Sequence, residues 1–412
     1  MQTSAFSRMD RLGAPCPAWM VTRFEAEGGR MSFRRFMELA LHDPVDGAYG
    51  SGRLRVGTKG DFVTSPSMGS DFAALLATQL AEWLDQIHAE APASPLSLVE
   101  VGPGEGDLAA DVWAELHRLN PAWIGQLELV LVERNPGMES RQRERLAASA
   151  PGQVRWTTLD KLAADPIRGV LVAHELLDAF PVERLIWRDG AMRQMGVVLT
   201  SDDAGQKVLH WDDQMLPDSI QQQLDWADRH CGISVPPAQV PEGWTTEWHG
   251  EVAPWLEQVA KAVASGVMLI VDYAHDAERY YSARRFAGTL LAYHQQQASD
   301  ELLADAGCRD LTAHLCIDTL LAQARDQGWT VLGQCRQGEA LLALGLGERL
   351  HNLQRLPATE LPQALQRREA LLRLVDPAGL GEFRWIALSR FPDEPRESEL
   401  ISRCLEAPKG FS

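Results

Sequence analysis

The sequence lacks the features that hold a protein in a membrane or cross-link it with disulfide bonds. It contains no run of about 18 apolar residues, the length that a transmembrane helix needs. Near the start, Arg8, Asp10 and Arg11 stand where a signal peptide would be apolar. The six cysteines are scattered, and no C-x-x-C pair indicates a zinc knuckle or a redox dithiol. We therefore expect a cytoplasmic protein with reduced thiols, no membrane partner and no metal site.

Basic residues are also scarce. Lysine and arginine total 39 against 57 aspartates and glutamates, which gives a formal net charge of −18. A nucleic-acid backbone is therefore not expected as the main partner. The acidic balance is consistent either with solubility alone or with a basic partner. With 412 residues, of which 45% are hydrophobic, the chain is long enough to bury a large core without disulfides or metal ions.

From residue 96 onward, short apolar runs alternate with stretches that have helical spacing. Runs that are apolar on both faces are typical of strands in a parallel sheet covered by helices. The sequence therefore predicts an α/β fold around seven strands. These strands are expected at residues 96–102, 127–133, 154–156, 169–175, 267–273, 329–335 and 383–390. The main helices are expected at residues 70–88, 107–120, 138–148, 250–266 and 318–328.

Other segments are expected to lie outside this sheet. Ser32 can cap a helix that ends at Asp43-Pro44, and Asp189-Gly190 is a typical hairpin turn. We therefore divide the chain into a cap, two core halves, two insertions and a tail. The predicted boundaries are 1–90 for an N-terminal helical cap and lid loop, 91–182 and 251–336 for the core halves, 183–250 for a β-hairpin and helical insertion, 337–380 for a helical insertion, and 381–412 for the final strand and tail.

The segment LVEVGPGEGDL, residues 98–108, is the sharpest local signal. A strand that ends in glycines before a helix lets the backbone approach a ligand, either a dinucleotide or a nucleoside. The spacing is G-x-G-x-G and not the G-x-G-x-x-G of dinucleotide sites. Glu100 would repel a pyrophosphate but could accept from a methionine ammonium, and Glu133 after the next strand could bind ribose hydroxyls. The alternative is a pair of tight turns with exposed acids.

A second polar group follows another buried strand. His174, Glu175 and Asp178 lie where open α/β sheets gather ligand and catalytic groups. Two carboxylates there could clamp a cation and orient a nucleophilic nitrogen. The alternative is a helix whose first turn favours acids. Asp178 occupies the position where a zinc-binding H-E-x-x-H motif needs histidine, so no metal is predicted.

Asp272 and Tyr273 follow the fifth strand in the same way. A role in a binding or catalytic site is as well supported for these residues as the alternative, an ordinary polar segment at the end of a strand. Upstream, the glycine-broken loop at residues 57–66 resembles a lid and not a phosphate-binding loop, because no strand–helix frame surrounds it. No G-x-S-x-G elbow occurs, so a hydrolase nucleophile is not expected.

Together these segments resemble the MidA-type S-adenosylmethionine-dependent methyltransferases, whose mitochondrial relatives are assembly factors of respiratory complex I. The resemblance implies a class I methyltransferase: a Rossmann-like, seven-stranded sheet, mostly parallel with an antiparallel last strand, with an N-terminal helical cap and insertions. The matching segments are SFRRFMELALHDPVDGAYG (32–50), GDFVTSP (60–66), LVEVGPGEGDLAADV (98–112), LVLVERNPGMESRQRERL (129–146), AHELLDAFPV (173–182), LIVDYAHD (269–276) and QGEALLALGLGERL (337–350).

The resemblance also implies S-adenosyl-L-methionine as the cofactor and an arginine-bearing protein as the substrate. Glu175 and Asp178 would clamp the guanidinium, and His174 would orient the cofactor or relay a proton. The implied substrate-binding residues are Tyr49, Asp272 and Tyr273. The implied cofactor-binding residues are Gly102 and Gly104 at the methionine end, Glu133 at the ribose, Glu100, Pro103 and Gly106 around them, and Gly60, Asp61, Phe62, Thr64 and Ser65 in the closing loop.

Two other functions stay open from the sequence. A small-molecule N- or O-methyltransferase could use the same fold, because a fold does not fix a function. A non-catalytic assembly factor could bind the cofactor only as a structural element. The leucine-rich residues 338–375 suit either packing on the sheet or a homodimer contact.

Overall fold

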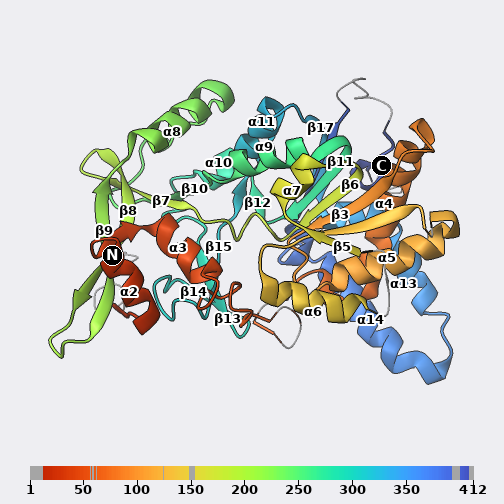
Figure 1. Ribbon diagram of the computed structural model, residues 1–412, viewed down its shortest axis with the longest axis horizontal. Helices are drawn as coiled ribbons and strands as arrows, with labels where there is room; N and C mark the ends of the chain where they lie inside the picture. Colours follow the sequence, from red (N-terminus) through yellow and green to blue (C-terminus); the bar gives the residue numbers. More distant parts are fainter. Residues whose placement is uncertain are drawn as a thin grey trace.

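The computed structural model describes residues 13–55, 57, 60–61, 63–123, 125–147, 154–391 and 400–407. Two large β-sheets lie towards opposite ends of its long axis (Figure 1). One has seven strands with helices on both faces, and the other has six antiparallel strands beside the N-terminal helices. The candidate site lies where these two parts meet.

The seven-stranded sheet contains the seven strands that the sequence predicts. Their order is β17-β18-β11-β6-β3-β4-β5, and only β18 runs antiparallel to its neighbours. The α/β fold with an antiparallel last strand is therefore confirmed. The strands are β3 (Leu96–Val101), β4 (Leu127–Val132), β5 (Val154–Thr157), β6 (Ile167–His174), β11 (Val263–Asp272), β17 (Thr330–Arg336) and β18 (Arg384–Arg390).

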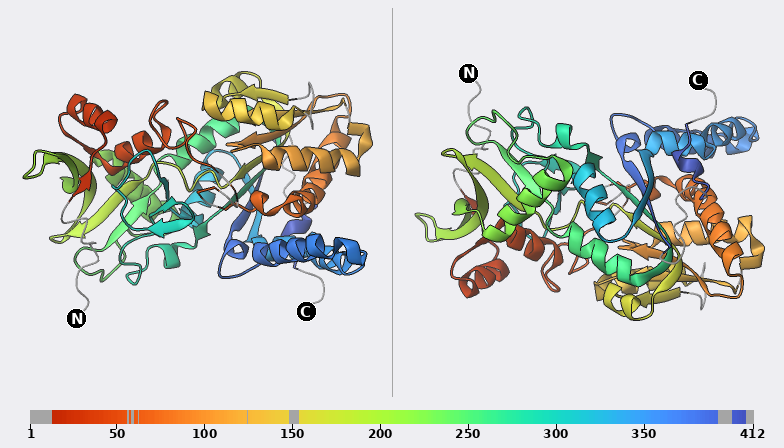
Figure 2. Two further views of the ribbon diagram at one scale, coloured as in Figure 1. Left: turned by 90° about the horizontal axis from the view of Figure 1, so that it is seen from below. Right: turned by 90° about the horizontal axis from the view of Figure 1, so that it is seen from above.

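Side chains alternate along these strands, so each strand contributes to two cores. In β3, Leu98 packs in the core on one face and Val99 packs in the core on the other. Figure 2 shows the blue C-terminal helices on one side of the sheet and the yellow segment around α7 on the other. The first face is covered by α4 (Ser70–Glu90), α5 (Asp107–Leu119), α12 (Gln337–Ala343), α13 (Leu346–Leu353) and α14 (Leu361–Leu374). The second face is covered by α7 (Leu159–Ala164), α9 (Val252–Ala262) and α11 (Ile317–Asp326).

The register of the parallel strands brings their carboxyl ends to one edge of the sheet. Val101 is paired with Val132 on one side and with Ala173 on the other, and His174 is paired with Val271. The residues that follow β3, β4, β6 and β11 therefore meet at this edge. Helix α6 (Pro136–Leu146) follows β4 there.

The six-stranded sheet joins the N-terminal segment to the insertion after residue 182. The predicted hairpin at Asp189-Gly190 connects two neighbouring strands of this sheet, and a strand at residues 245–248 forms one edge. The strands are β1 (Ala14–Pro15), β2 (Arg30–Ser32), β7 (Glu183–Arg188), β8 (Ala191–Ser201), β9 (Lys207–Met215) and β10 (Thr245–Trp248). The helices beside it are α2 (Ala18–Ala26), α3 (Phe33–His42) and α8 (Asp218–Cys231).

Helix α3 begins and ends as the sequence predicts. The Ser32 hydroxyl accepts from the Arg35 backbone N–H at 3.2 Å, which satisfies one free N–H of the first turn. Phe33 and Phe36 lie in a core shared with Leu290 and Leu311. Part of the chain after β11 therefore packs against the cap, through Leu290, Leu311 and their neighbours. The elements of this stretch are β12 (Ala274–His275), α10 (Ala277–Tyr280), β13 (Leu291–His294), β14 (Gln297–Ser299), β15 (Asp310–Thr312) and β16 (Leu315–Cys316). The predicted domain boundaries themselves stay a prediction.

Two expectations drawn from the composition concern the helices and the thiols. Among the described residues, no helix combines the length and the apolar character needed to cross a bilayer. All six cysteines lie in the described part of the chain, and each is a free thiol.

Candidate active site

A cavity of about 620 Å³ opens at the carboxyl edge of the seven-stranded sheet. Its walls come from the ends of β3, β4 and β6, from α3 in the cap and from α9. This volume is within the range of small-molecule sites. Nine of the residues predicted for the site line it: Tyr49, Thr64, Glu100, Gly102, Pro103, Gly104, Glu133, His174 and Glu175.

Two glycines after β3 form the floor beside the start of α5. Gly102 has a φ of +68°, and a Cβ there would lie 2.6 Å from Leu176 Cδ1. Gly104 has a φ of +52°, and a Cβ there would meet nothing within 4 Å, so its backbone faces open space. Gly106 is different, because a Cβ there would meet Gln142 at 3.5 Å. Gly106 does not line the cavity, and the lack of a side chain there lets the start of α5 pack closely against α6.

Glu133 is held in place by its neighbours at the end of β4. Its Oε1 accepts from the Asn135 backbone N–H and its Oε2 from Gln142 Nε2, both at 2.8 Å. Gln142 Nε2 also donates to the Gly104 carbonyl at 2.9 Å, and Trp156 Nε1 donates to Gln142 Oε1 at 3.1 Å. The buried Gln142 therefore joins the glycine loop to Glu133. Sequence reasoning missed it, although its spacing with Met138 and Leu146 places it on the buried face of α6.

Glu100 is a buried acid on the cavity wall. Burial, with a smaller contribution from the nearby Asp107, raises the pKa of Glu100 to about 8, and the Ala109 backbone N–H offsets part of this. The carboxyl group is therefore neutral at pH 7 unless a cation approaches it. A positively charged ligand group would favour its ionised form.

Glu175 follows β6 in a strained backbone conformation. Its φ is +48°, which is unusual for a residue with a side chain. The turn is fixed because the Glu175 N–H donates to the Val271 carbonyl at 2.8 Å and Oε1 accepts from the Ser65 backbone N–H at 3.2 Å. Burial raises the pKa of Glu175 well above its usual range, and Asp272 and Asp310 add to the effect.

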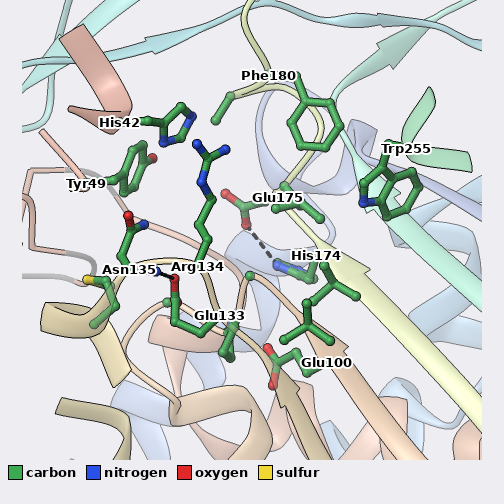
Figure 3. Close-up of a pocket in the computed structure, with 18 of the residues that line it drawn as sticks. His42, Tyr49, Glu100, Glu133, Arg134, Asn135, His174, Glu175, Phe180 and Trp255 are labelled. Carbon is green, nitrogen blue, oxygen red and sulfur yellow. Dashed lines mark hydrogen bonds and ion pairs between the residues drawn. The ribbon is translucent and has the colours of Figure 1, made fainter. Parts of the chain in front are cut away.

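His174 lies next to Glu175 on the cavity wall (Figure 3). Its Nδ1 is 3.6 Å from Glu175 Oε1, and burial lowers the pKa of His174 to about 3. Since the His174 ring is neutral at pH 7, this contact is not an ion pair. Nε2 of His174 has no hydrogen-bond partner within the described ranges, so a polar ligand atom could use it.

Three predicted residues around the end of β11 do not line the cavity. Asp272 accepts from the backbone N–H groups of Leu177 at 2.9 Å and Tyr273 at 2.8 Å, so it fixes the turn after β6. Asp178 is buried behind that turn. Burial raises the pKa of Asp178 well above its usual range, and the charges of Asp272 and Asp310 raise it further. The Tyr273 ring stacks on His314, with centroids 5.3 Å apart. Asp178, Asp272 and Tyr273 therefore lie outside the cavity lining, and their direct contact with the substrate stays a prediction.

The predicted closing loop reaches the cavity only in part. Thr64 lines the cavity, but Gly60, Asp61 and Ser65 do not. The Asp61 carbonyl accepts from the Gln296 N–H at 2.6 Å, which ties this residue to the β13–β14 turn. Ser65 is buried beneath the cavity wall, where its hydroxyl pairs with the Gln337 amide. Phe62 lies outside the described residues.

Several lining residues were not predicted. Arg134 extends across the cavity towards His42 and Tyr49 (Figure 3). Phe180 and Trp255 form an edge-to-face pair with centroids 6.0 Å apart. These side chains come from α3, α9 and two loops, and most of them lie within the segments that carry the family resemblance, although no role was predicted for them.

The residues present fit S-adenosylmethionine as a cofactor. The open backbone at Gly104 leaves space for the ligand, and the neutral buried Glu100 suits its ammonium group. The Glu133 carboxylate accepts hydrogen bonds from Asn135 and Gln142, and its four lone-pair sites leave room for a ribose hydroxyl.

Comparison with known proteins supports this interpretation. Residues 75–335 match a family model for S-adenosyl-L-methionine-dependent methyltransferases. The chain is 28% identical over 348 residues to the protein arginine methyltransferase NDUFAF7, mitochondrial, of Danio rerio, covering 79% of this chain and 75% of that one. It is 27% identical to the Drosophila melanogaster homolog over 390 residues, covering 87% and 82% of the two chains.

Solved structures agree with the family match. A Burkholderia thailandensis protein, crystallised with S-adenosylhomocysteine, superposes with a TM-score of 0.76 at 28% identity, covering 92% of this chain and 95% of that one. The comparison also corrects one expectation. The predicted cytoplasmic location is wrong, because the named relatives are mitochondrial proteins. The match over residues 75–335 shows that the chain belongs to the MidA-type family of S-adenosyl-L-methionine-dependent methyltransferases.

Proposed function

We propose that this methyltransferase acts on arginine side chains of a protein substrate. The observation that carries the proposal is Glu175, a buried carboxyl group held in a strained turn at the cavity wall. Eight carboxylic side chains and two arginines line the cavity, and Arg34 is already paired with Glu183 and Glu251. An acidic cavity suits a cationic acceptor. The curated relatives are named protein arginine methyltransferases.

The reaction needs one nitrogen of the guanidinium to be aligned and partly stripped of its positive charge. When bound, S-adenosylmethionine supplies an electrophilic methyl group and leaves as S-adenosylhomocysteine. Glu175 would hold the guanidinium through its N–H groups and fix the direction of attack. His174 and the Phe180–Trp255 pair would surround the reacting groups and exclude water.

Glu175 would also take the proton that the reaction releases. A guanidinium keeps its charge at neutral pH, so the attacking nitrogen loses a proton as its new bond to carbon forms. The arrival of the cationic side chain favours ionised Glu175, whose own proton then leaves to solvent. Because burial raises the pKa of Glu175, its carboxylate is a stronger base than an exposed one.

The cofactor roles belong to the same proposal. Gly102 and Gly104 would bind the methionine end through their backbone, Glu100 the ammonium and Glu133 the ribose. Asp178 and Asp272 would act behind Glu175 by fixing its turn. Homodimer formation through α14 stays a prediction; it is supported by the exposed side chains of Leu361, Leu365 and Leu372.

One experiment distinguishes the proposed arginine methylation from two other functions. We would incubate the purified chain with lysate and methyl-labelled S-adenosylmethionine, and then assign the label by mass spectrometry. We expect the label on an arginine side-chain nitrogen of a protein. Label on a small molecule would favour a small-molecule methyltransferase. Cofactor binding by calorimetry without any labelled acceptor would favour a non-catalytic assembly factor.

A further inference from the structure

A histidine that the proposed mechanism does not use lies on the cap side of the cavity. His42 is the last residue of α3, and its ring stacks on Tyr49 with centroids 5.9 Å apart and planes 21° apart. The Tyr49 hydroxyl donates to Asp310 at 2.9 Å, which fixes the tyrosine in turn. The His42 ring is therefore held in one orientation at the cavity wall.

The two ring nitrogens of His42 have different surroundings. One bonds to the backbone of Ala179, whereas Nδ1 is buried and has no hydrogen-bond partner in the described part of the chain. The nitrogen that faces Ala179 is therefore Nε2, and it carries the proton of the neutral ring. Burial, with a contribution from Arg134, lowers the pKa of His42 to about 3, so Nδ1 keeps its lone pair at pH 7. Such an unused buried acceptor is costly unless a ligand satisfies it.

A guanidinium group already lies beside this histidine. Figure 3 shows the side chain of Arg134 crossing the cavity, with its guanidinium between His42 and Tyr49 on one side and Glu175 on the other. The positive charge of Arg134 adds to the effect of burial in lowering the pKa of His42. This part of the cavity therefore already accommodates one guanidinium group.

We propose that His42 is a specificity-determining residue whose Nδ1 accepts an N–H bond from the guanidinium of the substrate arginine. The inference rests on the proposed arginine methylation. Glu175 would bind the same flat group from the sheet side, and Arg134 would occupy the place until the substrate enters. A guanidinium has five N–H donors in a fixed plane, so it can bond to two acceptors that approach from different sides.

The test uses ethylguanidinium as a probe for the end of the arginine side chain. Its binding to the full chain with S-adenosylhomocysteine would be followed by NMR for the wild type, His42→Phe and His42→Asn. Phenylalanine keeps a ring on Tyr49 but offers no acceptor, whereas the asparagine amide oxygen lies near the position of Nδ1. We expect His42→Phe to weaken probe binding by about 10-fold and His42→Asn to stay within about 3-fold of the wild type. The affinity for S-adenosylhomocysteine should not change.

Each other outcome has a distinct meaning. Equal probe binding by the wild type and His42→Phe would overturn the role of His42 and leave the proposed function standing. A loss that asparagine does not restore would also overturn it, because it would indicate a packing role only. A wild-type chain that binds S-adenosylhomocysteine but not ethylguanidinium would contradict the guanidinium substrate itself. Butylammonium, with its compact charge, serves as the control, and His42→Phe should leave its binding unchanged.

Discussion

The two sides of the cavity differ in how the chain builds them. The cofactor side comes from the ends of β3 and β4 and from α6, and its central contact joins Glu133 to Gln142, nine residues later. On the acceptor side, the contact between Ser65 and Glu175 spans 110 residues, and that between Tyr49 and Asp310 spans 261. The cofactor side is thus a local property of two strand ends. The acceptor side exists only when the cap docks on the sheet.

The largest effect on the cofactor side is expected from Gly102→Ala. The added Cβ would lie 2.6 Å from Leu176 Cδ1, at a φ of +68° that alanine rarely adopts. We expect the affinity for S-adenosylmethionine, measured by calorimetry, to fall by about 100-fold. Gly205→Ala is the matched control, because it also has a positive φ but meets nothing within 4 Å and lies in the β8–β9 turn. Unchanged affinity in Gly102→Ala would show that this loop does not shape the cofactor site.

A smaller effect on the same side is expected from Gln142→Ala. The substitution removes the hydrogen bonds to Glu133 and to the Gly104 carbonyl, so both groups lose their fixed positions. We expect the affinity for S-adenosylmethionine to fall by about 10-fold. Gln221→Ala, on the exposed face of α8, should leave the affinity unchanged. If both variants bind equally well, Gln142 has no part in positioning the site.

The smallest effect concerns Glu100 and pH. Because burial raises the pKa of Glu100 from 4.5 to about 8, the ligand-free folded chain binds more protons than the unfolded chain between these pH values. Stability should therefore fall as the pH rises through this window. Over the same pH range, we expect the midpoint of thermal unfolding to fall by about 3 °C less in Glu100→Gln than in the wild type. Identical pH profiles for the two proteins would rule out a buried neutral Glu100.

The sheet and most of the cofactor side could be predicted from the sequence, whereas part of the acceptor side could not. The apolar strands and their order along the chain predicted the sheet, and the strand ends predicted Glu100, Glu133 and Glu175. No role was predicted for His42 or Trp255, because they reach the cavity only through the docking of α3 and α9.

The departures from the predicted lining on the acceptor side have one local cause. A helix with acids in its first turn was one alternative after Glu175, and two carboxylates facing the substrate was the other. At Glu175 the φ is left-handed, no helix begins there, and Asp178 is buried behind the turn. Asp272 then caps the backbone of that turn. Strand-end position predicted which segments meet, but not which side chains face the cavity.

The central claim is that Glu175 binds the acceptor and takes up its proton, whereas the cofactor side of the cavity does not depend on Glu175. The most direct test measures both methyl transfer to protein arginine and the affinity for S-adenosylmethionine in Glu175→Gln. The amide keeps the shape of the side chain but removes its charge and its basicity. We expect methyl transfer to fall by about 1,000-fold or more and the cofactor affinity to stay within about twofold of the wild type. Glu251→Gln, at a half-exposed carboxylate paired with Arg34, is the matched control and should retain most of the activity. Wild-type methyl transfer by Glu175→Gln, or a parallel loss of cofactor binding, would contradict the account.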